Sequence, residues 1–128
     1  VTAMRRHKES AAVQEHACGA LVTLAYGSDD NQTAIAKEGG IDAVVTAMRR
    51  HEGSAAVQEH ACGALVTLAC GNDDNKAARA KEGGIDAVVT CMRRHEELVG
   101  VEEQACLALV NLARSNNDNK IAIAKAGG

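Results

Sequence analysis

The stretch GGIDAVVTAMRRHEGSAAVQEHACGALVTLA, residues 39–69, decides the fold because it contains two helical patterns joined by a short break. From Ile41 to His51, apolar residues recur at intervals of three and four, so they share one side of a helix. After the break, Ser54 is a typical N-cap for a longer helix from Ala55 to Ala69. The apolar positions of the two helices are Ile41, Val44, Val45 and Met48 in the first, and Val57, Ala61, Ala64, Leu65 and Leu68 in the second.

The same pattern recurs along the chain with a period of 44 residues. The sequence VTAMRRH at 1–7 returns at 45–51, and returns again as VTCMRRH at 89–95. Residues 1–44 and 45–88 differ at seven positions and are therefore identical at 37 of 44, whereas residues 89–128 match 45–84 at 25 of 40. We call residues 1–44, 45–88 and 89–128 the first, second and third repeats. A fixed period of this length is typical of helical repeat proteins, whose units bury their apolar faces only by stacking.

A third, shorter helix precedes the other two within each period. The residues from Asn31 to Glu38 form its first copy, with Asp30 as the expected N-cap. Asp74 and Asp118 occupy the same position in the later copies. The pair Gly39-Gly40 follows as a stop, because glycine readily adopts the left-handed conformation that ends helices.

This three-helix pattern resembles the armadillo repeat family over the whole chain. The matching features are the short first helix ending in Gly-Gly, then IDAVVTAM, then AVQEHACGALVTLA. The resemblance implies an all-α right-handed superhelical solenoid of about three repeats, forming a single domain over 1–128. The related HEAT repeats have two helices and usually a proline in the first, and this chain has no proline. Armadillo repeats commonly have a proline near the start of the second helix, where this chain has Asp42 and Asp86.

Composition narrows the function classes. The chain has 128 residues, 46% hydrophobic and 24% charged, with a net charge of −3 and Tyr26 as its one aromatic residue. The charge balance gives no basic field for nucleic acid or anionic lipid, and no apolar run approaches the roughly 20 residues that span a bilayer. Without a signal-peptide pattern, we expect a reducing cytoplasmic or nuclear setting. The chain starts within a second helix and stops after a first helix, so we expect a segment of a longer array with uncapped ends that associate end to end.

The histidines and cysteines are better explained by packing than by chemistry. In His16/Cys18 and His60/Cys62, the two side chains are about 200° apart around a helix axis and cannot share a metal ion. The cysteines at 18, 62 and 106 recur with the period, as expected of small apolar interface residues, whereas Cys70 and Cys91 occur in one copy each. Histidines at 7, 51 and 95 end the second helices, where they suit the helix dipole and the last carbonyl groups. No catalytic motif is present, so we expect no enzyme activity, no cofactor and no metal.

One stripe of the longest helices is the candidate binding surface. At 100° per residue, positions such as 16, 19, 23 and 26 lie together, away from the apolar set Val13, Ala17, Ala20, Leu21 and Leu24. In the armadillo family these helices line a concave groove, and the resemblance implies that the stripe faces it. The candidate protein-binding residues are His16, Gly19, Thr23, Tyr26, His60, Gly63, Thr67, Cys70, Gln104, Leu107, Asn111 and Arg114.

The stripe departs from armadillo proteins that bind extended peptides. Such proteins typically carry a tryptophan and, four residues later, an asparagine; the aligned pairs here are Gly19/Thr23, Gly63/Thr67 and Leu107/Asn111. Without tryptophan walls, a flatter surface suits a folded partner or a helix better. The sequence therefore predicts a non-catalytic protein-interaction or scaffold module. The alternatives are a purely structural spacer in a larger assembly and a regulatory array of a larger protein.

Overall fold

The computed structural model describes residues 1–69, 83–113 and 117–126, and these form helices with no strand among them. The helices are α1 (Thr2–Arg6), α2 (Ala11–Ala25), α3 (Asp29–Lys37), α4 (Gly40–Arg50), α5 (Ala55–Ala69), α7 (Gly84–Arg94), α8 (Val99–Ala113) and α9 (Asn117–Lys125). The expected second helix at 41–51 and third helix at 55–69 are thus present as α4 and α5. The predictions made for Asp74 and Cys70 fall outside the described residues, as does the one made for Arg114.

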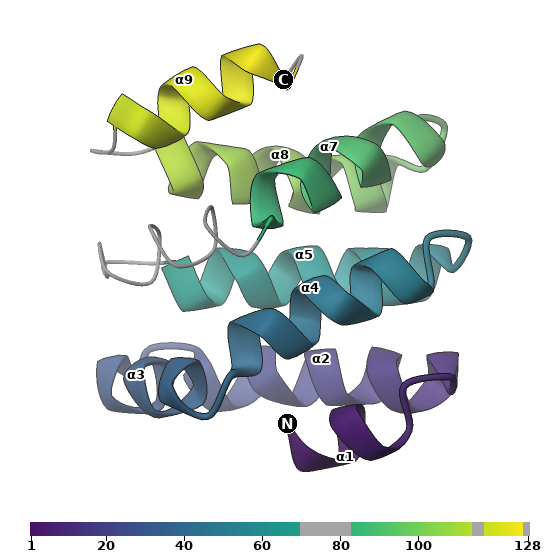
Figure 1. Ribbon diagram of the computed structural model, residues 1–128, viewed down its shortest axis with the longest axis vertical. Coiled ribbons are helices and arrows are strands. Elements are labelled where there is room, and N and C mark those ends of the chain that lie inside the picture. The colour runs from purple at the N-terminus through teal and green to yellow at the C-terminus, as the bar shows by residue number, and fades with distance from the viewer. Residues whose placement is uncertain (70–82, 114–116, 127–128) are drawn as a thin grey trace.

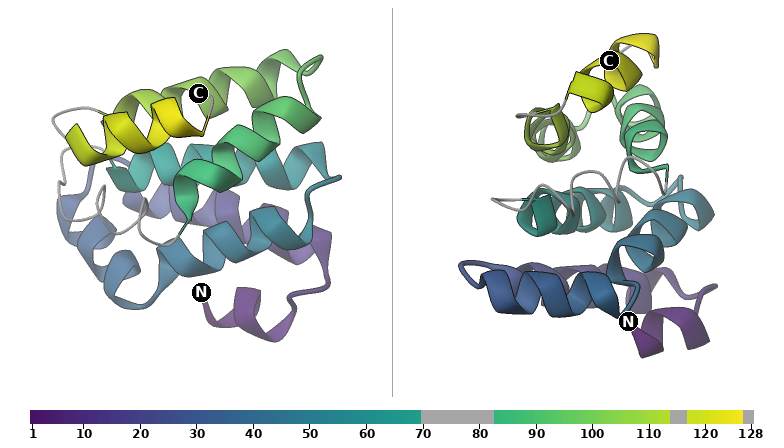
Figure 2. Two further views of the ribbon diagram at one scale, coloured as in Figure 1. Left: turned by 45° about the horizontal axis from the view of Figure 1, so that its top comes forward. Right: turned by 60° about the vertical axis from the view of Figure 1, so that its left-hand side comes forward.

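The helices form an α-solenoid with two layers. Helices α2, α5 and α8, the third helices of successive repeats, lie one above another (Figure 1), and the most extensive packing is between α2 and α5 and between α5 and α8. The second helices α1, α4 and α7 form the other layer, which is seen separately in the right-hand view of Figure 2. Helix α3, a first helix, lies between the third helix α2 and the second helix α4, and the other described first helix, α9, follows the third helix α8.

Serine caps start the helices of the first two repeats. The hydroxyls of Ser10 and Ser54 accept hydrogen bonds from the amides of Val13 and Val57, both at 3.3 Å, which confirms the predicted N-caps of α2 and α5. Such caps satisfy an amide that has no partner inside the helix.

The predicted cap of the short first helix was wrong. Helix α3 begins earlier than expected, because the hydroxyl of Ser28 accepts from the amide of Asn31 at 3.2 Å. Asp30 therefore lies inside the first turn, where its carboxylate still favours the helix dipole. Asp118 likewise lies within α9 rather than before it.

Gly39 separates α3 from α4 with a left-handed backbone, φ 80° and ψ 25°, as the Gly-Gly stop predicted. Gly83 repeats this geometry before α7, with φ 84°. A Cβ atom at either glycine would collide with an arginine guanidinium, that of Arg5 at Gly39 and that of Arg49 at Gly83. The arginine side chain can move aside, so it is the left-handed conformation that requires glycine at both positions.

The hydrophobic core is continuous from repeat to repeat and is best formed around α5. All five apolar positions predicted for this helix, from Val57 to Leu68, have no exposed surface. The same prediction for α2 was partly wrong: Ala20 is exposed and Leu24 is 58% exposed. The two helices have identical sequences, but this side of α5 is covered by α2, whereas no described helix covers the corresponding side of α2.

Candidate functional site

The third helices create a shallow groove that contains five of the predicted binding residues. Its lining consists of Gly19, Val22 and Thr23 from α2, Glu59, His60 and Gly63 from α5, and Gln104 from α8, and its volume is about 410 Å³. The groove thus crosses all three repeats. We call it the third-helix groove.

Glycines bring the third helices close enough to form the floor of this groove. A Cβ atom at Gly19 would lie 3.3 Å from the imidazole of His60, so the ring of His60 rests over the bare backbone of α2. In the same way, a Cβ at Gly63 would lie 3.6 Å from Oε1 of Gln104. Each long polar side chain therefore lies across the glycine of the preceding repeat. The groove's polar groups are held there by this close packing.

Internal hydrogen bonds fix several of the predicted binding residues. Nδ1 of His60 lies 2.8 Å from the carbonyl oxygen of Ala56, which matches a protonated Nδ1 donating to that oxygen. The hydroxyl of Thr67 donates to the carbonyl of Gly63 at 2.9 Å, and the side chain of Thr67 is only 8% exposed. The amide nitrogen Nδ2 of Asn111 donates to the carbonyl of Val66 at 3.5 Å and so links α8 to α5. Thr67 is thus bonded within α5 and Asn111 links α8 to α5, so the accessible polar groups of the groove are elsewhere.

The exposed members of the stripe lie around the groove. His16 and Thr23 are exposed on α2, Tyr26 is 81% exposed at the end of α2, and Leu107 is 44% exposed on α8. Cys18 is fully buried while His16 is exposed, so these two side chains lie on different sides of α2, as their spacing indicates. In the described part of the chain, no three His, Cys, Asp or Glu side chains are close enough together to hold a metal ion.

A second kind of hollow occurs between successive second helices, and the sequence analysis did not find it. One cavity, of about 280 Å³, is lined by residues of α4, of α7 and of the turn after α4, including Arg49, Glu52 and Cys91. The other, of about 160 Å³, is lined by the residues 44 positions earlier, including Arg5, Lys8 and Ala47. Because the linings correspond position by position, these second-helix cavities are a property of the repeat.

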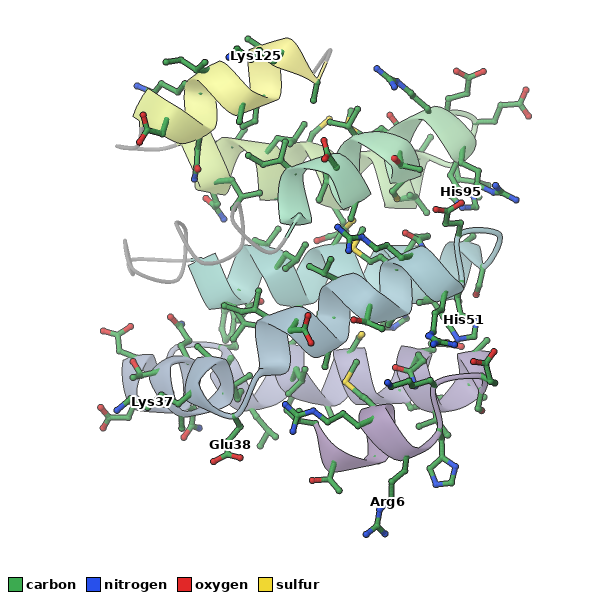
Figure 3. All side chains as sticks on the ribbon, in the orientation of Figure 1. Arg6, Lys37, Glu38, His51, His95 and Lys125 are labelled. Carbon is green, nitrogen blue, oxygen red and sulfur yellow. The ribbon has the colours of Figure 1, made fainter. Side chains whose placement is uncertain are left out.

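The second helices are also joined by side chains that bond to carbonyl groups of the neighbouring repeat. Nε2 of His51 lies 2.7 Å from the carbonyl oxygen of Lys8, and Nε2 of His95 lies 2.7 Å from that of Glu52. Figure 3 shows both rings at the same edge of the stack. The two histidines were predicted to bond the last carbonyls of their own helices, but each instead contacts a carbonyl of the preceding repeat. Arg5 also bonds to a carbonyl group, that of Glu38 at 2.8 Å, but both residues belong to the first repeat, and the bond joins α1 to the end of α3.

The comparisons with known proteins agree with this architecture. The sequence model of a family described as the LRRK2 ARM repeat matches residues 1–125. The chain belongs to this armadillo repeat family. Its fold is similar to the crystal structure of an engineered protein, a Northeast Structural Genomics Consortium target, with a TM-score of 0.82 and 27% sequence identity. That similarity covers 92% of this chain and 46% of the engineered one, so the armadillo chain spans about half the length of that protein.

A search of curated proteins gave no match. Among the described residues, no helix of this armadillo chain is long and apolar enough to cross a membrane. The family and the fold therefore establish a helical repeat module.

Proposed function

We propose that this armadillo module binds a protein partner through the third-helix groove. The observation that carries the proposal is the junction at Gly19 and Gly63, where the bare backbone opens a groove of about 410 Å³ beside accessible polar groups. Buried backbone and core residues make up most of the remaining α2, α5 and α8 interface. A concave surface with a few convergent polar groups is the usual form of a recognition site.

The chemistry of the groove favours a helix or folded surface that presents a basic residue. The carboxylate of Glu59 is exposed at the rim, and its Oε1 atom would lie 3.3 Å from a Cβ at Gly100. A lysine or arginine of the partner can pair with this carboxylate while small apolar side chains pack against Val22, which also lines the groove. No large aromatic anchor lines the groove, so we infer shape complementarity rather than a few dominant aromatic contacts.

The experiment uses helical peptides selected from a displayed library against the whole chain, with affinity then measured by fluorescence polarisation. Gly63→Leu introduces the residue that the third repeat carries as Leu107, and it fills the groove from its floor. We expect peptide affinity to fall by at least about tenfold, because a filled cavity removes a contact worth more than about 1.4 kcal/mol.

The matched control is Lys8→Glu, which introduces the residue that the second repeat carries as Glu52 and which lies by the second-helix cavity. It should leave affinity unchanged. If the selected peptides bind Gly63→Leu as well as the unmodified chain, or if they lose affinity with Lys8→Glu instead, the groove is not the binding site.

A rigid spacer is the second candidate, and the core that runs without a break from α2 through α5 to α8 favours it. Deleting residues 45–88 removes one whole period. If the chain is a spacer, the deletion shortens the distance between its two ends but leaves whatever each end binds unchanged. If the chain binds through the groove, the deletion lowers its affinity for the selected peptides. We also infer a reducing cytoplasmic or nuclear compartment from the free thiols of Cys18, Cys62 and Cys91.

A further inference from the structure

Two cysteines from different repeats meet at the floor of the larger second-helix cavity. Cys91 of α7 lines this cavity of about 280 Å³ and is 3% exposed. Cys62 of α5 is completely buried and belongs to the same hydrophobic cluster. The two thiols lie close enough to shift each other's pKa, and α5 packs directly on α7. One of the two sulfur atoms can therefore be reached from the cavity, and the other lies behind it.

This pair is specific to the junction between the second and third repeats. At the preceding junction, the residues 44 positions earlier are Cys18 and Ala47, so the position equivalent to Cys91 carries a methyl group there instead of a thiol. Ala47 lines the smaller cavity of about 160 Å³ in the same way that Cys91 lines the larger one. Because Cys91 stands where the other repeats have alanine, a second thiol lies beside Cys62 at this junction alone among the described residues.

The environment makes the two thiols chemically different. The hydrogen bond from Cys62 lowers the pKa of Cys91, although burial and the Glu102 carboxylate oppose this. The same hydrogen bond and complete burial raise the pKa of Cys62, to which Glu102, Cys18 and Cys91 also contribute. Cys91 lines the cavity and Cys62 does not, so Cys91 is the thiol that meets an oxidant there, and its lowered pKa favours the reactive thiolate.

The remaining charges at the cavity come from two arginines and two acids. The guanidinium groups of Arg49 and Arg94 and the carboxylates of Glu52 and Asp86 all line it. Arg94 and Glu52 form an ion pair with an N–O distance of 3.6 Å. The cavity volume of about 280 Å³ is several times the roughly 30 Å³ that one water molecule occupies in the liquid. A small neutral oxidant therefore fits into the cavity.

We propose that Cys62 and Cys91 are a redox-active pair, which hydrogen peroxide entering the second-helix cavity converts into a disulfide between the second and third repeats. In the first step, the Cys91 thiolate attacks one peroxide oxygen, the O–O bond breaks, and the released hydroxide takes a proton to become water. Cys91 is then a sulfenic acid. In the second step, Cys62 loses its proton and its sulfur attacks the Cys91 sulfur, which expels the hydroxyl group as a second water. Two thiols are oxidised and one peroxide is reduced to two waters.

The test exposes the fully reduced chain to hydrogen peroxide, blocks the remaining thiols with N-ethylmaleimide in denaturant, and maps non-reduced peptides by mass spectrometry. The expected product is a cross-link between Cys62 and Cys91 that a dithiol reverses, with a mass loss of two hydrogens. Cys18, which has Ala47 at the position equivalent to Cys91, should remain available for labelling after Cys62 and Cys91 have been consumed. Exposed Cys106 serves as an internal reference for an unpartnered thiol.

Two variants taken from the repeats themselves decide the outcome. Cys91→Ala introduces the residue that the other repeats carry as Ala3 and Ala47, so the variant should fold. Far-ultraviolet circular dichroism checks its folding. If Cys91→Ala does not fold, Cys91→Ser replaces it. Either variant should leave Cys62 labelled and give no internal cross-link. Ala47→Cys should add a second cross-link, between Cys18 and the introduced thiol.

Three results would overturn the proposal. They are a Cys91 that does not react with peroxide, a Cys91 that is oxidised to a sulfinic or sulfonic acid while Cys62 remains labelled, and a cross-link from Cys91 to Cys106 between two molecules.

Discussion

Replacing Glu102 by glutamine should stabilise the chain, because the third repeat lacks hydrogen bonds that the first two repeats make. In the first repeat, the amide nitrogen Nε2 of Gln14 donates to the carbonyls of Met4 and His7 at 3.1 and 2.9 Å. In the second repeat, Nε2 of Gln58 donates to the equivalent carbonyls of Met48 and His51, both at 2.9 Å. These bonds tie the third helix of each repeat to the end of its second helix.

Glu102 occupies the same position in the third repeat but cannot donate when it is ionised. The carbonyls equivalent to those of Met48 and His51 belong to Met92 and His95. The Oε1 atom of Glu102 is buried and has no hydrogen-bond partner within the described residues. A net contribution of about 0.5–1.5 kcal/mol per hydrogen bond makes two bonds worth about 2 kcal/mol. For a domain of this size we expect Glu102→Gln to raise Tm by about 6–10 °C.

Thermal and urea unfolding followed by circular dichroism measure this effect. Glu103→Gln is the matched control, since it removes the same charge from the neighbouring, exposed position. The reciprocal change Gln58→Glu should destabilise the chain by at least as much, because it breaks two existing bonds. The reasoning is refuted if Glu102→Gln and Glu103→Gln shift Tm equally, since the gain would then come from net charge alone.

Three further outcomes follow from the fold. Gly39→Ala should lower the free energy of unfolding, measured with a chemical denaturant, by at least about 1–2 kcal/mol because φ is 80°. Gly53→Ala should lower it much less, because a Cβ added at Gly53 would lie 3.7 Å from its nearest neighbour. Burial raises the pKa of Cys18 from 9.0 to about 12, so between these values the folded state keeps a proton that the unfolded state loses. The free energy of unfolding should therefore fall as pH rises from 9.0 toward 12. Cys18→Ala should remove part of this pH dependence. We propose that copies associate end to end through the uncovered side of α2, where Leu24 is exposed. Leu24→Lys should then reduce the sedimentation coefficient at high concentration. A monomer at high concentration for both the unmodified chain and the variant would contradict this.

Helix positions and caps were predictable because they depend on residues close in sequence. The apolar stripe of α4, the caps Ser10 and Ser54 and the turn at Gly39 are all local patterns. The cap of α3 was mispredicted for a local reason as well, since serine and aspartate are both good caps and both occur in Ser28-Asp29-Asp30. The repeat period then indicated that neighbouring repeats stack, and the structure shows that the third helices pack on one another.

Exposure was not predictable from local sequence, as α2 and α5 demonstrate. The two helices have the same 15 residues, yet Leu24 is 58% exposed and the equivalent Leu68 is completely buried. Likewise His16 is exposed, whereas His60 rests on Gly19. Identical residues acquire different roles because burial depends on which helices lie above and below. The stripe of candidate binding residues could be found from periodicity, but the selection of five that line the groove required the stacked helices.

Glu102 and Cys91 occur at their positions in the third repeat alone, and their effects on each other follow from their being neighbours in the stack. Glu102 raises the pKa of both Cys62 and Cys91, so the carboxylate that lacks its hydrogen bonds also opposes thiolate formation at the cysteine pair. Glu102→Gln should therefore strengthen the stack and at the same time speed the reaction of Cys91 with hydrogen peroxide. If Cys91 reacted only after local unfolding, the stabilised variant would react more slowly, because its open state would be less populated. Rates of peroxide-dependent cross-linking in Glu102→Gln and Glu103→Gln distinguish the two cases, and a slower rate in Glu102→Gln would show that the cavity does not admit the oxidant to the folded chain.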